Sequence, residues 1–284
     1  MAANMKAVKL RIKSVQNTMQ ITKAMELVAS SKLRKAKERA EGCRPYFEEL
    51  YSTLKEIAQG NTDFASVFAK EPVNDKICYV VIAGDRGLAG GYNSNLFKCM
   101  EAESKGKDYM VLPVGKKALE YFKRRKVEII NETFDAVEPI DVADCYEMAS
   151  FLCKEFKKGR FGTLKLVYTE FVSMLSQQAH SIAVLPLSEL NADKPAEPIR
   201  NLIIYEPDSN SVFDTIVPEY VAGVIYGAVC ESLASEQAAR RTAMESATSN
   251  AEEMIETLNL HYNRARQASI TQEITEIIGG AEGV

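Results

Sequence analysis

A glycine-rich segment is the part of this chain best suited to chemistry. Residues 84–93 read GDRGLAGGYN and follow the apolar run KICYVVIA at 76–83. Backbone N–H groups at a helix start attract anions, so such a loop can cradle phosphate. Its Gly84, Gly87 and Gly90 give G-x-x-G-x-x-G, which is neither the dinucleotide fingerprint nor the P-loop, and no acidic residue ends the next apolar run to bind a ribose. We therefore interpret the segment as a tight strand-to-helix turn, with nucleotide binding as the alternative.

No other set of side chains predicts a reaction. His180 and His261 are the only histidines, and neither has neighbours at metal-ligand spacing, so we expect both to pack in the core or on the surface. Asp85 and Arg86 are expected to form a local ion pair. The sequence contains neither G-x-S-x-G nor H-E-x-x-H. It thus predicts no catalytic residues, no cofactor and no metal.

The cysteines and the N-terminus indicate a cytosolic protein. The six cysteines show no C-x-x-C spacing, which favours free and mostly buried thiols in a reducing compartment. The basic, amphipathic N-terminus could be a transit peptide, but its helical pattern continues without a break. No apolar run approaches the roughly 20 residues of a membrane span.

The positions of the prolines predict long helices at both ends. All nine lie between Pro45 and Pro218, and proline breaks a helix interior. Gly42 and Pro45 mark an expected weak point in the first helix, and the continuous part of the last is expected to start after Pro218. The chain thus divides into an N-terminal helix over 1–60, a central domain over 74–207 and a C-terminal helix over 212–284.

Both terminal helices carry apolar seams with alternating steps of three and four residues, the period of a coiled coil. The N-terminal seam contains Val8, Ile12, Val15, Met19, Thr22, Glu26, Ala29, Leu33, Ala36 and Ala40, of which Glu26 interrupts the apolar stripe. The C-terminal seam contains Ala251, Ile255, Leu258, Tyr262 and Ala265, after a stretch rich in alanine and glycine that permits close helix approach. Two seams at opposite ends of one chain predict an antiparallel pair.

The middle of the chain alternates strands and helices, which predicts an open, Rossmann-like α/β sheet. The expected strands are 76–83, 109–114, 127–130, 163–172, 179–187 and 201–205, with a loop over 188–198. The expected helices are 94–104, 116–124 and 142–158. Little helix separates the last two or three strands, so we expect them to pair antiparallel. The fold class is α/β, with a long antiparallel coiled coil added.

Charge is distributed unevenly and leaves the partner open. Residues 1–40 hold ten basic and two acidic residues, whereas the remainder holds 25 basic and 37 acidic ones. A basic helix can follow nucleic acid or meet an acidic protein or membrane surface. The basic residues spread round the helix without interleaved aromatics, and the seam requires a helical partner, so a solvated face or a rim that meets an acidic protein is favoured over nucleic acid.

Three segments carry a family resemblance. ITKAMELVASSKLRKA at 21–36, GDRGLAGGYN at 84–93 and ARQASITQEITEIIGGA at 265–281 closely resemble the gamma subunit of bacterial F-type rotary ATP synthase. The C-terminal signature residues are Ile270, Thr271, Glu273, Glu276, Gly280 and Ala281. The chain departs from the family pattern at Gly283, where a small or basic residue is usual.

The resemblance implies a rotor shaft. The paired terminal helices would stand inside a ring of three alpha and three beta subunits, and the α/β domain would face the epsilon subunit and the membrane ring of c subunits. Ion-driven rotation of the c ring would turn the chain and cycle the beta subunits through ATP synthesis or hydrolysis. Nucleotide chemistry would belong to beta. The chain would be a peripheral protein on the cytoplasmic side of a bacterial cell membrane, reaching the membrane only through the complex.

The resemblance also assigns residues to the coupling surfaces. Arg266 and Gln267 would bind a loop of beta through charge-assisted hydrogen bonds. The other polar or coupling positions would be Met25, Arg86, Arg240, Thr271, Glu273 and Glu276. An apolar bearing at the tip would consist of Ile270, Ile274, Ile277 and Ile278. The chain has Ala89 where many members have cysteine and lacks the chloroplast regulatory insert, so thiol control is not expected.

A second interpretation is a free-standing coiled-coil adaptor or nucleic-acid-binding protein with an α/β head. The coupling ion, the dominant direction of the reaction, regulation by epsilon and the source organism are not determined by this sequence.

Overall fold

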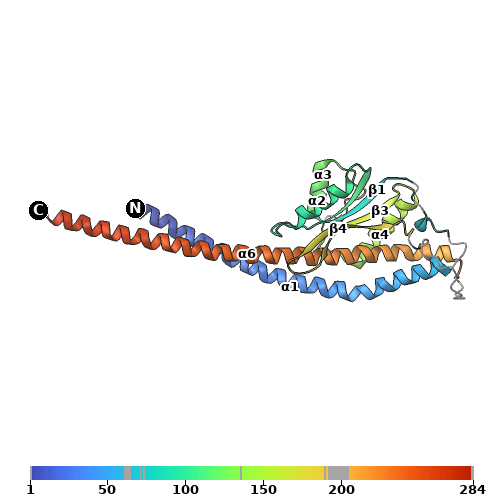
Figure 1. Cartoon of the computed structure of the whole chain (residues 1–284), viewed down its shortest axis with the longest axis horizontal. Coiled ribbons are helices and arrows are strands. Elements are labelled where there is room, and N and C mark those ends of the chain that lie inside the picture. Colours follow the sequence, from blue (N-terminus) through green and yellow to red (C-terminus); the bar gives the residue numbers. More distant parts are fainter. Residues whose placement is uncertain are drawn as a thin grey trace. The chain divides into compact units, whose positions relative to one another are not determined.

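The computed structural model describes residues 2–60, 65–70, 72, 74–134, 136–188, 190 and 205–282. They form two compact units. The sheet unit is Ser31–Ala239, and the helical unit combines Met1–Ser30 with Arg240–Val284. Two helices, α1 (Ala2–Gly60) and α6 (Ser209–Glu282), contribute residues to both units, which are described in turn (Figure 1).

The sheet unit contains a mixed four-stranded sheet. Its strands are β1 (Ile77–Ile82), β2 (Tyr109–Val114), β3 (Thr163–Phe171) and β4 (Gln177–Leu185), in the spatial order β2-β1-β3-β4. β1 pairs in parallel with β2 and β3, and β4 is antiparallel to β3. The predicted α/β class and the antiparallel pairing of the late strands are therefore confirmed.

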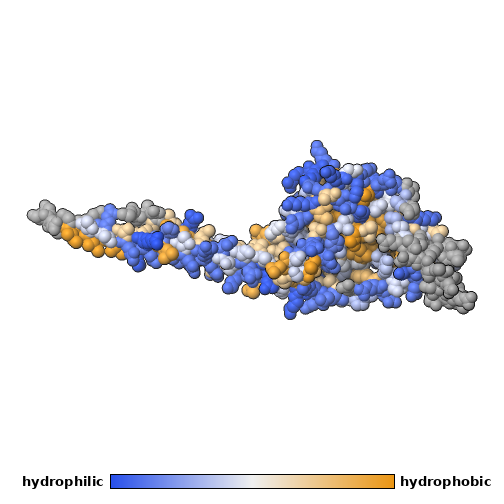
Figure 2. Space-filling model, viewed as in Figure 1, coloured by the Kyte–Doolittle hydropathy of each residue, from blue (hydrophilic) through white to orange (hydrophobic). Residues whose placement is uncertain are grey.

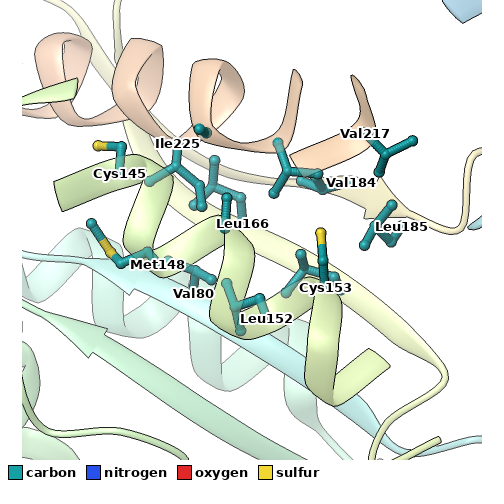
Figure 3. Packing of buried hydrophobic residues seen from close by; sticks show 14 of the residues in the cluster. Val80, Cys145, Met148, Leu152, Cys153, Leu166, Val184, Leu185, Val217 and Ile225 are labelled. Carbon is teal, nitrogen blue, oxygen red and sulfur yellow. The ribbon is translucent and has the colours of Figure 1, made fainter. Parts of the chain in front are cut away.

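Helices cover both faces of this sheet. α2 (Tyr92–Ser104) and α3 (Lys116–Arg125) pack on one face, where Tyr79 and Val81 meet Leu96 and Phe122. α4 (Val142–Lys157), α6 and the end of α1 cover the other face. Figure 3 shows α4 residues such as Leu152 meeting Val80, Leu166 and Ile225 there. Burial on both faces explains why the parallel strands are almost continuously apolar. A short 3₁₀ helix, η1 (Val67–Ala69), adds Phe68 to this core.

Within the sheet unit, α1 and α6 approach closely through small side chains. A Cβ atom on Gly223 would lie 1.9 Å from Cδ1 of Phe47, so the Phe47 ring occupies the space that a larger residue would need. Farther along, Ala234 and Ala238 pack with Leu33 in a separate apolar cluster. The alanine- and glycine-rich stretch therefore serves helix contact, as its composition predicts.

The two outermost prolines do not end the helices. Pro45 lies inside α1, so the helix predicted over 1–60 continues through it, whereas Pro218 lies inside α6, so the expected start after Pro218 is wrong. A proline inside a helix costs about 3 kcal/mol. Phe213, Val217 and Val221 are fully buried beside Pro218, and each such side chain gains about 1.5–3 kcal/mol on burial. Core packing therefore outweighs the missing hydrogen bond.

The start of α6 is fixed by Asp208, which lies just before its first turn. Its carboxylate accepts hydrogen bonds from the backbone N–H of Ser211 at 2.9 Å and from the Ser211 hydroxyl at 2.6 Å. These bonds lower the pKa of Asp208. A carboxylate in this place satisfies helix donors that otherwise lack partners.

The expected strand over 127–130 is reduced to one bridge. Val111 donates its N–H to the carbonyl of Glu128 and accepts from Ile130, both at 2.9 Å, and its bridge partner is Ile129. The next outward-facing position on this edge of β2 is Pro113, which has no N–H to donate. Pairing therefore stops there. Most of the expected 188–198 loop and of the 201–205 strand lies outside the described residues, and Tyr205 is not in a strand.

By length and composition alone, α6 is apolar enough over Ser209–Thr275 to cross a membrane, although no such run was expected. Half of its apolar window is buried inside the protein, and a core helix passes the same test. Val217, Val221 and Ile225 belong to the core beneath the sheet. We therefore assign this apolar character to packing.

We predict that Gly115→Ala destabilises the chain strongly. Gly115 has φ +95°, and an added Cβ would lie 2.1 Å from the carbonyl oxygen of Ala83 at the end of β1. Such a clash moves backbone, and overpacking typically costs about 1–3 kcal/mol beyond the strain of a positive φ. The free energy of unfolding in urea measures the loss.

Gly106→Ala is the matched control, because Gly106 also has a positive φ of +75° but no atom within 4 Å of its added Cβ. Equal losses in the two variants would contradict the steric explanation.

Candidate functional site

In the helical unit, α1 and α6 pair along the predicted seams. On α1, Val8, Ile12, Val15 and Met19 are half-buried and Thr22 is buried. On α6 the covered positions are Met244, Thr248, Ala251, Ile255, Leu258, Tyr262, Ala265 and Ser269. The helices run in opposite directions, with both termini at the same end (Figure 1). The predicted antiparallel pair is confirmed here.

One buried polar contact lies within the seam. The hydroxyl groups of Thr22 and Thr248 are 2.7 Å apart, and one donates to the other. The hydroxyl that accepts this bond can itself donate to a backbone carbonyl of its own helix. The Thr22 hydroxyl lies 3.0 Å from the carbonyl of Met19, and the Thr248 hydroxyl lies 2.9 Å from that of Met244. A buried polar pair in an apolar seam favours one register over others.

The predicted coupling residues of the helical unit differ in exposure. Met25 is half-buried and Arg240 is 9% exposed, so neither presents its whole side chain. Arg266, Gln267, Thr271 and Glu273 are exposed, and the Thr271 hydroxyl donates to the carbonyl of Gln267 at 2.9 Å. The side chain of Glu276 lies outside the described residues.

The end of α6 presents an apolar stripe. Ile270, Ile274, Ile277 and Ile278 are between 48% and 71% exposed, although their spacing places them on one helix face. Beyond Ser269, which is buried, α6 continues past the N-terminus of α1 (Figure 1), and Figure 2 shows apolar atoms along this end. Each isoleucine forgoes roughly half or more of the about 1.5–3 kcal/mol that full burial would provide. The stripe is therefore a surface suited to a partner.

In the sheet unit, the glycine-rich loop is a structural junction. The Asp85 carboxylate accepts the backbone N–H groups of Lys116 at 3.2 Å, Val137 at 3.0 Å and Glu138 at 3.2 Å. The start of α3, where a phosphate could bind, thus holds a carboxylate from the chain itself. The Gly84 N–H donates to the side chain of Asn93 at 3.0 Å, which tightens the turn. These contacts agree with the tight-turn interpretation.

The expected ion pair between Asp85 and Arg86 is wrong, because Asp85 binds backbone donors instead. Arg86 is exposed next to Leu88, which is 64% exposed. The tip of the loop is thus open to solvent, while its base is fixed by Asp85.

The histidines and cysteines show no reactive arrangement. His180 packs edge-on against Tyr168 across the β3–β4 pair, with ring centroids 4.6 Å apart, as a packing role predicts, and His261 is exposed on α6. Four cysteines are buried, and burial raises the pKa of Cys153 to about 12. Over the described ranges, no group of three His, Cys, Asp or Glu residues could hold a metal ion.

A row of polar side chains on the buried face of α6 was not predicted from the sequence. β3 continues past the end of β1, and Thr169 lies in this overhang. Because β1 has ended there, the backbone of Thr169 bonds to α6 instead. The Thr169 N–H donates to the Ser232 hydroxyl at 3.3 Å, and the Thr169 carbonyl accepts from the Ser235 hydroxyl at 3.1 Å. The sequence signal that could have indicated these contacts is the recurrence of polar residues within an alanine-rich helix.

Comparisons with known proteins agree with this architecture. The family model described as ATP synthase matches residues 4–284. The ATP synthase gamma chain of Ruminococcus albus is 49% identical over 97% of this chain and 96% of its own. The sodium-ion-specific gamma chain of Acetobacterium woodii is 42% identical over the full length of both.

Solved structures show the same fold at low identity. A chain of the Euglena gracilis mitochondrial ATP synthase OSCP/F1/c-ring structure aligns with a TM-score of 0.69 at 18% identity, covering 100% of this chain and 95% of that one. A chain of the Tetrahymena thermophila central stalk/c-ring structure gives 0.61 at 23%, covering 80% and 99%.

Two terminal helices paired around an inserted α/β domain thus define a central-stalk type of protein. The chain belongs to the ATP synthase family, among its bacterial gamma chains. Its function is that of the rotor shaft, which couples ion-driven rotation to ATP synthesis or hydrolysis as a non-catalytic subunit. The interpretation as a free-standing adaptor or nucleic-acid-binding protein is set aside.

We predict that Thr248→Val lowers stability by about 1 kcal/mol, the usual net value of a hydrogen bond. Valine keeps the shape of threonine but removes the hydroxyl that meets Thr22. Thr257→Val is the control, because Thr257 is exposed on the same helix and its hydroxyl bonds only the carbonyl of Glu253, at 3.0 Å. Thermal unfolding compares them, and equal effects would contradict a role for the buried pair.

We also predict that Asp85→Ala lowers the free energy of unfolding by about 2 kcal/mol, because three backbone N–H groups, including the partly buried one of Val137, lose their acceptor. Asp75→Ala removes a carboxylate from an exposed position and is expected to stay within about 0.5 kcal/mol. Denaturant titration measures both. An unchanged Asp85 variant would show that the loop does not depend on this carboxylate.

Proposed function

We propose that the paired helices of the helical unit turn inside a ring of three alpha and three beta subunits, with the end of α6 as the upper bearing. The single observation that carries this proposal is the exposed stripe of Ile270, Ile274, Ile277 and Ile278. Apolar contacts have little directional preference, so an apolar collar round such a stripe would resist rotation little. Directional hydrogen bonds at this contact would instead favour one rotational angle of the shaft.

The polar residues are proposed to transmit force. Arg266 and Gln267 are exposed next to the apolar stripe, where they can bind a loop of beta through charge-assisted hydrogen bonds. Thr271 and Glu273 continue this polar surface along the helix, and Glu276 is proposed as a further coupling residue from its position in the sequence. A shaft with an apolar stripe and a polar surface is asymmetric, so each beta subunit would meet a different surface as it turns.

The buried or half-buried coupling residues have a different proposed role. Arg240 and Met25 belong to the seam region of the helical unit, so their effect on coupling would pass through the packing of the helix pair. Arg86 lies on the exposed tip of a loop whose base is fixed by Asp85. It is proposed to meet an acidic part of beta, to which the basic residues of α1 would also be attracted.

The sheet unit is proposed to contact the epsilon subunit and the c ring. The relatives' structures that support this come from F1/c-ring and central stalk/c-ring assemblies. The chain would then be a peripheral protein on the cytoplasmic side of a bacterial membrane, attached only through the complex. No nucleic acid and no cofactor enter this proposal, and the coupling ion would be selected by other subunits.

We predict that Met25→Lys impairs coupling more than folding. The lysine would place a second cation near Arg240 or beside beta, at a half-buried position where a charge is costly. ATP hydrolysis and ion pumping are measured together in the assembled complex. We expect the variant to retain more of its ATP hydrolysis than of its ion pumping.

Met25→Leu serves as the control, since it keeps the volume and apolar character of the side chain. It is expected to leave the ratio of pumping to hydrolysis unchanged. If Met25→Lys reduced hydrolysis and pumping in parallel, the proposed coupling role of this position would be wrong.

A further inference from the structure

A small cavity in the sheet unit is lined by basic side chains of α1. Its volume is about 250 Å³, below the range of about 300–1,000 Å³ that drug-sized ligands occupy. Lys32, Lys35 and Arg39 lie on the α1 side, and Glu138 lies at the rim. The remaining wall comprises Ala36 of α1 and Cys230, Leu233 and Gln237 of α6.

The three basic residues share one face of α1. They stand at positions i, i+3 and i+7, so their side chains are neighbours along the helix surface. Lys32 forms an ion pair with Glu138. Among the described residues, Lys35 and Arg39 have no acidic partner in any ion pair. The cavity therefore has two uncompensated positive charges, with Glu138 as its one lining carboxylate.

Gln237 provides an independent indication of a ligand. It is only 6% exposed, and it is one of the residues that line the cavity. Within the described part of the chain, its side-chain amide has no hydrogen-bond partner. The amide atoms are not among the fully enclosed polar atoms that lack a partner, so they are open to the cavity, where water or a bound anion can complete their hydrogen bonds. An amide beside two free cations is placed to donate to a bound anion.

The rest of the wall does not oppose an anion. Burial raises the pKa of Cys230 to about 11, so this thiol is neutral at pH 7. Ala36 is buried and Leu233 is half-buried, and both are apolar, so this part of the wall adds no negative charge.

We propose that this cavity binds a phosphate group, held by Lys35, Arg39 and the amide of Gln237. A phosphate group carries about −1.5 to −2 charges at pH 7, which matches the two uncompensated cations better than a single carboxylate does. Arginine forks and lysine ammonium groups are the usual phosphate donors. The site lies outside the helical unit and requires nothing of the proposed rotary role.

The test is calorimetric titration of the full chain at low ionic strength, with inorganic phosphate as the first probe and ADP as the second. Saturable phosphate binding is expected. Lys35→Gln and Arg39→Gln should each weaken it about tenfold, since each removes a charged hydrogen bond. Gln237→Leu should also weaken it, and binding of ADP with the same dependence would identify a nucleotide as a source of the group.

Arg34→Gln is the matched control. It removes one positive charge from the residue before Lys35, but Arg34 pairs with Glu38 at 3.8 Å and does not line the cavity. It should leave phosphate binding unchanged. Lys35 and Arg39 are exposed, so their variants test the proposal even if Gln237→Leu fails to fold.

Three results would overturn the proposal. The first is no saturable binding of phosphate, and the second is an equal loss in Arg34→Gln, which would indicate a diffuse charge effect. The third is binding of a glutamate-rich peptide, sensitive to Lys35→Gln, in place of phosphate. That result would make the cavity a docking point for an acidic protein segment.

Discussion

The long helix α6 has to be buried against two different neighbours along its length, and this constraint determines much of the structure. In the sheet unit a broad face is covered by the core beneath the sheet, so apolar and small residues are nearly continuous from Phe213 to Ala238. In the helical unit only a narrow seam is covered, and residues such as Met244 and Ala251 recur every three or four positions. The change in composition along one helix thus reflects a change in what covers it.

Polar side chains within the buried part of α6 have to be explained by their partners. Ser232 and Ser235 form hydrogen bonds with the backbone of Thr169, where β3 extends beyond the end of β1. Glu236 lies against Gly84, where an added Cβ would be 2.8 Å from its carboxylate. These contacts connect the helix to the ends of the inner strands β1 and β3 at defined positions, which apolar packing alone would not specify.

The seams, the mixed sheet and the burial of the cysteines could be predicted because each depends on local spacing and composition. Other features depend on contacts distant in sequence. Asp85 pairs with the backbone near Val137 rather than with its neighbour, and Pro113 limits a strand fourteen residues later in the chain. Helix continuity through Pro218 depends on burial that spacing does not reveal. The cavity beside Gln237 was unpredictable for the same reason, because it needs two helices in contact.

The distribution of thiols has a practical chemical consequence. All six cysteines lie between Cys43 and Cys230, within the sheet unit, and only Cys43 and Cys99 are not fully buried. Burial raises the pKa of Cys99 as well, so its thiolate is scarce at neutral pH. The helical unit contains no sulfhydryl group. A single cysteine introduced there would give a fluorophore or crosslinker attachment point whose signal reports on the helix pair with little background from native thiols.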